Sequence, residues 1–191
     1  MKADFRQWKH VFKLDPEREI SDEALEQICL SATDAVMVGG STGVTFDNTL
    51  DLLSRIRRYA VPCVLEVSAR EGIMPGFDFY FIPVVLNTHK AEWLIGRHYR
   101  TLRELGTKLP WEAVAAEGYI ILNGQSTVAQ MTGADADLDA RGVMAYAALA
   151  ENLFSLPIVY IECSGVFGDM DLVRNVRDSL RHARLFYGGG I

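Results

Sequence analysis

The chain has 191 residues, of which 49% are hydrophobic and 23% charged, and both values are typical of one globular domain over residues 1–191. Its formal net charge of −6 argues against nucleic-acid binding, which depends on lysines and arginines that neutralise phosphates. No apolar run approaches the length of a membrane-spanning helix, so no membrane span is expected.

Apolar segments that end in a polar residue or a glycine alternate along the chain with segments of helical periodicity. They predict seven strands, at residues 11–15, 34–38, 61–68, 79–86, 118–122, 158–165 and 184–187. Helices are expected at about residues 21–32, 47–59, 90–105 and 141–154, and a further one capped near Asp169. The helix at 47–59 carries Leu50, Leu53 and Ile56 at helical spacing, and the helix at 90–105 is expected to face inward with Ala91, Leu94, Ile95 and Leu102.

Strands that alternate with helices imply a parallel sheet, built here as an open doubly wound sheet or as most of an eight-stranded barrel. Polar residues or glycines follow each strand, namely Asp15, Ser41, Glu66 with Ser68, Asn87, Asn123, Glu162 with Ser164, and Gly188. A barrel gathers all of these strand ends, whereas an open sheet gathers only those beside its switch point. The sequence therefore favours an α/β fold of the (βα)₈ TIM-barrel type.

The three cysteines, Cys29, Cys63 and Cys163, are odd in number and far apart in the sequence. None belongs to a Cys-x-x-Cys pair. Neither disulfides nor zinc are expected, and a reducing cytoplasmic location is favoured.

The segment at residues 158–165 carries a carboxylate at the end of an apolar strand. Tyr160, Glu162 and Ser164 share one side of this strand, and the other side is fully apolar. Burying a charge without a partner is costly, so Glu162 either reaches water at the end of the strand or belongs to a functional site. The strand alone leaves both interpretations open.

Other segments could bind phosphate or metal. Gly188-Gly189-Gly190 directly follows the seventh predicted strand, where barrels often bind phosphate, although a flexible turn would explain it equally. Gly39-Gly40-Ser41 has the same form and the same two interpretations. Lys13 and Asp15 share one strand face, which suggests either a cation or anion site or a simple ion pair.

Five segments occur in one order, at residues 8–16, 33–41, 62–68, 160–165 and 186–191 (WKHVFKLDP, TDAVMVGGS, PCVLEVS, YIECSG and FYGGGI). Together they resemble the prenylglyceryl phosphate synthase family, specifically its bacterial heptaprenylglyceryl phosphate synthases. The resemblance implies a homodimeric (βα)₈ barrel that joins a polyprenyl diphosphate to sn-glycerol 1-phosphate with Mg²⁺ and releases diphosphate. The family continues for roughly one more βα unit beyond the triple glycine, so the resemblance also implies that the eighth unit is missing from this sequence.

The resemblance also implies roles for individual residues. Lys13 is expected to bind glycerol 1-phosphate, and Asp15 and Ser41 are the expected Mg²⁺ positions. The segment expected to hold glycerol phosphate comprises Tyr160, Ile161, Glu162, Cys163, Ser164 and Gly165. Glu162 is expected to contact the glycerol hydroxyls and to act as the catalytic base. Gly188, Gly189 and Gly190 are expected to form a phosphate loop.

Two other functions remain open at this point. A phosphosugar isomerase on the same barrel would use Asp15 and Glu162 as an acid–base pair. A non-catalytic phospholipid-binding protein would bind its ligand without releasing diphosphate. Dependence on Mg²⁺ and release of diphosphate separate these functions from the synthase.

Overall fold

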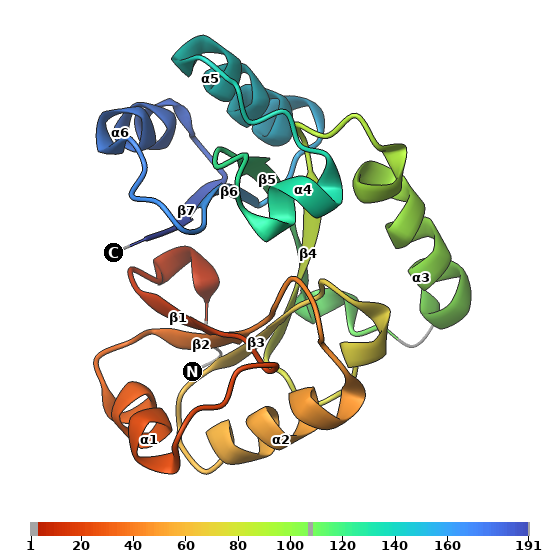
Figure 1. Ribbon diagram of the computed structural model, residues 1–191, viewed down its shortest axis with the longest axis vertical. Helices are drawn as coiled ribbons and strands as arrows, with labels where there is room; N and C mark the ends of the chain where they lie inside the picture. The colour runs from red at the N-terminus through yellow and green to blue at the C-terminus, as the bar shows by residue number, and fades with distance from the viewer. Residues whose placement is uncertain (1–3, 107–108, 191) are drawn as a thin grey trace. The chain divides into compact units, whose positions relative to one another are not determined.

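The structure is a computed structural model that describes residues 4–106 and 109–190, and it is an α/β protein (Figure 1). The strands of these residues are β1 (Val11–Leu14), β2 (Ala35–Val38), β3 (Cys63–Glu66), β4 (Phe79–Val85), β5 (Val114–Ile121), β6 (Ile158–Cys163) and β7 (Arg184–Gly189). They belong to one sheet in the order β1-β2-β3-β4-β5-β6-β7, and the registers of β1 with β2, β2 with β3, β3 with β4, β5 with β6, and β6 with β7 are parallel. All seven predicted strands are confirmed, and the largest change is that β5 begins at Val114 rather than at residue 118.

The helices of the described residues are α1 (Asp22–Leu30), α2 (Phe46–Ile56), α3 (Arg97–Leu105), α4 (Thr127–Thr132), α5 (Ala140–Ala148) and α6 (Met170–Ser179). Short helical segments accompany them, namely 3₁₀ turns at η1 (Phe5–Gln7), η2 (Arg70–Gly72) and η5 (Trp111–Ala113), and π-helical turns at η3 (Glu92–Gly96) and η6 (Leu149–Leu153). The predicted cap at Asp169 is confirmed, because its carboxylate accepts hydrogen bonds from the backbone N–H groups of Asp171 and Leu172. None of the helices described combines the length and the apolar character that crossing a bilayer requires.

The described chain divides into two compact units. The first unit contains the described residues up to Ile82 together with Pro110–Val114, and the second contains the remainder. The expectation of a single domain over residues 1–191 stays a prediction.

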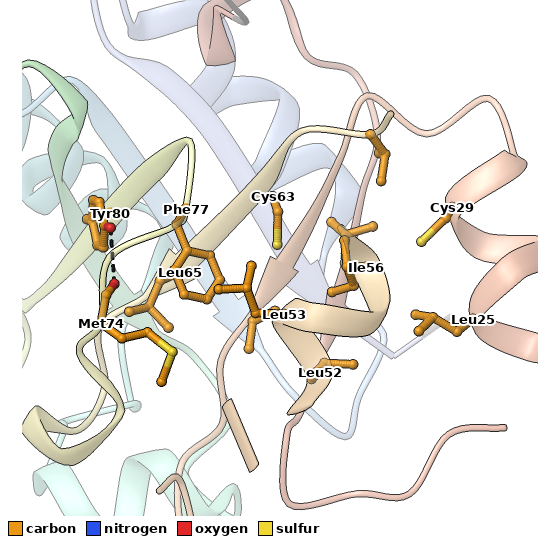
Figure 2. Close-up of a cluster of buried hydrophobic side chains, with 13 residues drawn as sticks. Leu25, Cys29, Leu52, Leu53, Ile56, Cys63, Leu65, Met74, Phe77 and Tyr80 are labelled. Atoms are coloured by element: carbon orange, nitrogen blue, oxygen red, sulfur yellow. Dashed lines mark hydrogen bonds between the residues drawn. The ribbon is translucent and has the colours of Figure 1, made fainter. Parts of the chain in front are cut away.

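In the first unit, helices α1 and α2 pack against one face of β2, β3 and β4 (Figure 2). The core between them contains Leu25, Cys29, Val36, Val38, Leu52, Leu53, Ile56, Cys63, Leu65, Met74, Phe77 and Tyr80. Alternate residues of the same strands, such as Met37 and Val64, are also buried but lie outside this core cluster. Because both faces are buried, these strands consist almost entirely of apolar residues. Near the amino ends of the strands, Phe5 and Trp8 pack edge-on against Phe79.

In the second unit, the alternation of β6 separates two apolar clusters. Val159, Ile161 and Cys163 pack with α5 and α6 residues that include Val143 and Val176. Tyr160 on the opposite face packs with Val85, Tyr119 and Ile121. The three cysteines of the chain are free thiols, and each is buried in the core of its own unit.

The predicted inner face of the helix at 90–105 is wrong, because Leu94, Ile95 and Leu102 are 36%, 64% and 41% exposed. Ala91 is exposed as well, and the segment contains a π-helical turn, η3 at Glu92–Gly96, whose wider turn departs from the α-helical spacing on which the prediction rested. In α2, Leu53 and Ile56 are buried as expected, but Leu50 is exposed.

Candidate functional site

The predicted site residues lie at the carboxyl ends of strands and fall into two groups, one in each unit. The β1–β3 group consists of Lys13, Asp15, Ser41 and Glu66, together with Gly39 and Gly40. The β6–β7 group consists of residues 160–165 and 188–190.

Lys13 and Glu66 form an ion pair in the β1–β3 group. Lys13 Nζ lies 2.8 Å from Glu66 Oε1 and 2.7 Å from Oε2, so both carboxylate oxygens contact the ammonium. The Glu66 side chain is 5% exposed and that of Lys13 33%. The sequence identified Glu66 only as a strand-end residue, and its pairing with Lys13 was missed. The pair depends on the strand order and register, which place β1 and β3 on the two sides of β2 and cannot be read from either strand alone.

Gly39 and Gly40 make room for two carboxylates. A Cβ atom at Gly39 would lie 2.9 Å from both Cβ and Oε2 of Glu66, and a Cβ atom at Gly40 would overlap the carboxylate of Asp15. Neither glycine has a positive φ, so space rather than backbone conformation requires glycine here. The space beside this double glycine is thus filled by side chains of the protein itself, and a phosphate-binding role for its backbone stays a prediction.

Asp15 is partly exposed and is held by its own turn. Its Oδ1 accepts a hydrogen bond of 3.0 Å from the Glu17 N–H, and its Oδ2 lies 4.0 Å from Arg18 Nε. Ser41 is exposed and follows Gly40, the residue that backs the Asp15 carboxylate. Within the described part of the chain, no three His, Cys, Asp or Glu side chains gather into a metal-binding cluster. One carboxylate and a hydroxyl nevertheless fit Mg²⁺, which usually keeps several waters and is held by one or two carboxylates plus substrate phosphates.

Glu162 is the buried carboxylate of the β6–β7 group. It is 3% exposed, so it does not simply reach water at the end of its strand. Its Oε1 accepts a hydrogen bond of 2.7 Å from the Ser164 N–H and a second, short one from the Ser164 hydroxyl. Ser164 therefore orients the carboxylate through two donors of one residue.

The turn that follows Glu162 is tightly specified. The Val166 N–H donates to the Cys163 carbonyl at 3.0 Å, and Gly165 inside this turn has a φ of +87°, a conformation that glycine adopts without strain. Asn123 Nδ2 donates to the Ser164 carbonyl at 2.6 Å and fastens the turn to the end of β5.

The glycines at the end of the described chain have a different setting from the one expected. Gly188 and Gly189 lie within β7, paired in register with Glu162 and Cys163, so the strand continues through them rather than ending before them. A Cβ atom at Gly188 would overlap the hydroxyl of Tyr160, and one at Gly189 would overlap the hydroxyl of Tyr187.

The two tyrosine hydroxyls therefore occupy the space that side chains would take. Tyr160 also stacks on Tyr119, with ring centroids 4.3 Å apart and an interplanar angle of 9°. Its hydroxyl is thereby fixed beside the β7 backbone. The phosphate-binding role of Gly188, Gly189 and Gly190 stays a prediction.

Two predicted substrate-binding residues point away from this group. The side chains of Ile161 and Cys163 are 0% and 2% exposed and lie in the core with α5 and α6. Only their backbone atoms could contact a ligand on the Glu162 side. Asn87, another strand-end residue, has a structural role. Its Nδ2 donates a hydrogen bond to the Ile121 carbonyl, and its Oδ1 accepts one from the Ile121 N–H.

Both groups thus lie at the carboxyl ends of parallel strands, where α/β enzymes that bind phosphorylated substrates carry their polar side chains. This arrangement is typical of α/β enzymes whose active sites lie at the carboxyl ends of parallel strands. Residues 3–191 match the model of the PcrB family, and the chain belongs to this family.

Curated relatives carry a more specific description. The chain is 57% identical to the heptaprenylglyceryl phosphate synthase of Bacillus mycoides (strain KBAB4) and 58% identical to that of Bacillus cereus (strain ATCC 14579). Each alignment covers 188 residues, which is 98% of this chain and 82% of the relative.

Solved structures share the fold. Wild-type GGGPS from Thermoplasma volcanium matches with a TM-score of 0.83 and 22% identity, over 96% of this chain and 76% of that one. The (S)-3-O-geranylgeranylglyceryl phosphate synthase from Thermoplasma acidophilum, solved in complex with its substrate sn-glycerol-1-phosphate, matches with a TM-score of 0.81 and 24% identity, over 97% of this chain and 78% of that one.

Proposed function

We propose that this chain transfers a long polyprenyl group, heptaprenyl in the first instance, from its diphosphate to sn-glycerol 1-phosphate and releases diphosphate. The observation that carries the proposal is Glu162, a carboxylate buried at the end of β6 and oriented by two hydrogen bonds from Ser164. The identity of 57% and 58% to heptaprenylglyceryl phosphate synthases over 98% of the chain supports the same reaction.

In this reaction, the glycerol hydroxyl oxygen forms a bond to the allylic carbon of the prenyl chain while the bond from that carbon to the diphosphate oxygen breaks. Glu162 accepts the hydroxyl proton, which requires hydrogen-bond reach and an ionised carboxylate. Ser164 keeps one carboxylate oxygen in a fixed orientation. The hydroxyl of Tyr160, fixed by stacking on Tyr119, and the backbone of the 163–166 turn are suited to bind the glycerol phosphate.

We propose Asp15 and Ser41 as the residues that hold Mg²⁺. The ion would supply the positive charge that neutralises the departing diphosphate. The partly exposed carboxylate of Asp15 and its fixed seat against Gly40 support this role. Lys13 is proposed as a ligand for the phosphate of sn-glycerol 1-phosphate.

The finer parts of the fold and the assembly are also proposals. Seven strands in sequential order and the likeness to the Thermoplasma enzymes, which are TIM-type barrels, support a (βα)₈ barrel. A homodimer follows from the resemblance alone, and a cytoplasmic location follows from the odd number and wide spacing of the cysteines. Light scattering on the purified protein tests the first, and fractionation of the source cells tests the second.

Product analysis tests the proposed reaction directly. Labelled sn-glycerol 1-phosphate is offered with prenyl diphosphates of several lengths, with Mg²⁺ and again with excess EDTA. We expect a labelled prenyl ether and one equivalent of diphosphate, both dependent on Mg²⁺. Binding of glycerol phosphate without release of diphosphate would show a non-catalytic protein instead. Conversion of phosphosugars without any prenyl donor would show an isomerase.

A further inference from the structure

Glu66 has no role in the proposed reaction, yet it holds a cation that does. Both of its carboxylate oxygens lie within 2.8 Å of Lys13 Nζ, and its side chain is 5% exposed. Three neighbours of this pair on the same strand faces, Met37, Val64 and Phe81, are apolar and at most 2% exposed. A buried charge pair is often no more stabilising than two apolar side chains of similar size. A contribution to stability is therefore a weak reason for Lys13 and Glu66 to be there.

The Glu66 side chain is held in place from two sides. Glu66 is the last residue of β3 and pairs in register with Phe81 of β4. Its Cβ and Oε2 pack against Gly39, where a methyl group would come within 2.9 Å of both. The carboxylate is thus fixed by the sheet on one side and by a side-chain-free backbone on the other.

Lys13 is the flexible partner of this pair. A lysine side chain loses about 2 kcal/mol of rotamer entropy when it is immobilised, so an ammonium that must meet a ligand in one place benefits from a fixed anchor. An ammonium has three N–H donors, and contact with a carboxylate does not prevent it from also donating to a phosphate oxygen. The 33% exposure of the Lys13 side chain leaves it accessible to such a ligand.

We propose that Glu66 is a positioning residue that holds the Lys13 ammonium in place for the phosphate of sn-glycerol 1-phosphate. The proposal rests on the proposed function. An anchor and a general electrostatic effect predict opposite changes in substrate affinity when Glu66 is removed. A carboxylate that merely lay near the phosphate would repel it, so its removal would strengthen substrate binding, whereas removal of an anchor weakens binding.

The test is a double-mutant cycle with steady-state kinetics in varied sn-glycerol 1-phosphate at saturating heptaprenyl diphosphate. The proteins are wild type, Glu66→Gln, Lys13→Met and the double variant. We expect Glu66→Gln to raise KM by about tenfold, which is the size of a lost charge-assisted hydrogen bond, and to leave kcat within about twofold. In the Lys13→Met background the same change should alter KM less than about twofold, because the residue through which Glu66 acts is gone.

Two further variants complete the design. Asp78→Asn is the matched control, because Asp78 is also an ion-paired carboxylate of the first unit, 2.9 Å from Arg57, and it lies beside the amino end of β3 through its hydrogen bond to the Cys63 N–H. It should leave KM unchanged. Glu66→Asp keeps the charge but withdraws it by one methylene, so it should also raise KM, and it serves if the glutamine variant does not fold.

The outcomes separate the two proposals. A wild-type protein that forms no prenyl ether would overturn the proposed function and this inference with it. An active wild type, with a KM that falls or stays constant in folded Glu66→Gln and Glu66→Asp, would overturn the inference alone. So would a tenfold rise in KM that persists in the Lys13→Met background.

Discussion

Glu162 combines a negative charge with almost complete burial, and Ser164 supplies two of the hydrogen bonds that this combination requires. Glutamine at this position keeps the shape and part of the hydrogen bonding but cannot accept a proton. Glu162→Gln should therefore lower turnover by about 10²–10⁴-fold, the range observed for loss of a general base. Affinity for glycerol phosphate should remain, since an amide still hydrogen-bonds hydroxyls.

Turnover, ligand affinity and thermal stability should be measured on one preparation of each protein. Ser164→Ala is the companion variant, because it removes the hydroxyl donor but keeps the backbone N–H that also binds Glu162. Its loss of turnover should be smaller. Turnover of Glu162→Gln within a few-fold of wild type would remove Glu162 from the mechanism.

Gly40 offers a test of Asp15 that leaves the carboxylate itself unchanged. A methyl group at Gly40 would overlap the Asp15 carboxylate and displace it. Gly40→Ala should therefore raise the Mg²⁺ concentration needed for half-maximal activity, by about tenfold or more if one metal ligand is misplaced. Gly124→Ala is the matched control, because the nearest atom to its added methyl group lies at an ordinary 3.6 Å. An unchanged Mg²⁺ requirement in a folded Gly40→Ala protein would contradict the assignment of Asp15.

At the scale of elements, the π-helical turn η6 fastens the start of β7 through one side chain. Oε1 of Glu151 accepts hydrogen bonds from the N–H groups of Arg181, His182 and Ala183 at 2.8, 2.7 and 2.8 Å. Burial by itself would raise the pKa of Glu151, but these three backbone hydrogen bonds outweigh it and lower the pKa below its ordinary value. The turn before β7 is thus bound most firmly when Glu151 is ionised.

A lowered pKa makes this stabilisation dependent on pH. It is fully present above the ordinary glutamate pKa of the unfolded chain and is lost as the pH falls through the lower pKa of the folded protein. Glu151→Gln should reduce the free energy of unfolding by about 1 kcal/mol at neutral pH, with a difference that shrinks in acid. Thermal unfolding at several pH values measures this, with Glu26→Gln on the exposed face of α1 as the control. A difference that stays constant down to acidic pH would argue against the three-bond clamp.

Element boundaries could be predicted from the sequence where a local chemical signal marks them. Ser21 and Asp169 cap α1 and α6 as expected, since an N-cap needs only a short polar side chain at the right position. The inner face of the helix predicted at 90–105 was wrong, because that prediction assumed one continuous α-helical spacing and the segment contains the π-helical turn η3. Helix α4 has only six residues, too few to show a helical periodicity. Ser126 and Gly133, which cap its two ends, are residue types that mark helix boundaries in a sequence.

At the scale of the whole molecule, the order of the strands could be predicted, because consecutive strands of an alternating β and α chain usually become neighbours. The presence of Lys13, Asp15 and Glu162 at strand ends could be predicted as well. Their partners could not. The pairing of Lys13 with Glu66, and the close approach of Tyr160 to Gly188, depend on strand register and on space left by glycines. Neither is encoded in the composition of a single segment.

The buried thiols give each unit its own reporter of unfolding. Burial, opposed only in part by Arg57, raises the pKa of Cys63 to about 12, and burial together with the charge of Glu162 raises that of Cys163 to about 11. Only the thiolate reacts with alkylating reagents, so at a fixed pH the folded protein offers a thiolate fraction about 10²–10³-fold below that of the unfolded chain, before steric protection is counted.

Pulses of iodoacetamide along a denaturant series, followed by peptide mass spectrometry, should label Cys63 only when the first unit opens and Cys163 only when the second does. Rapid labelling of either thiol in the native protein would contradict this. The native cysteines thus report the opening of each unit separately, without any engineered cysteine or attached label.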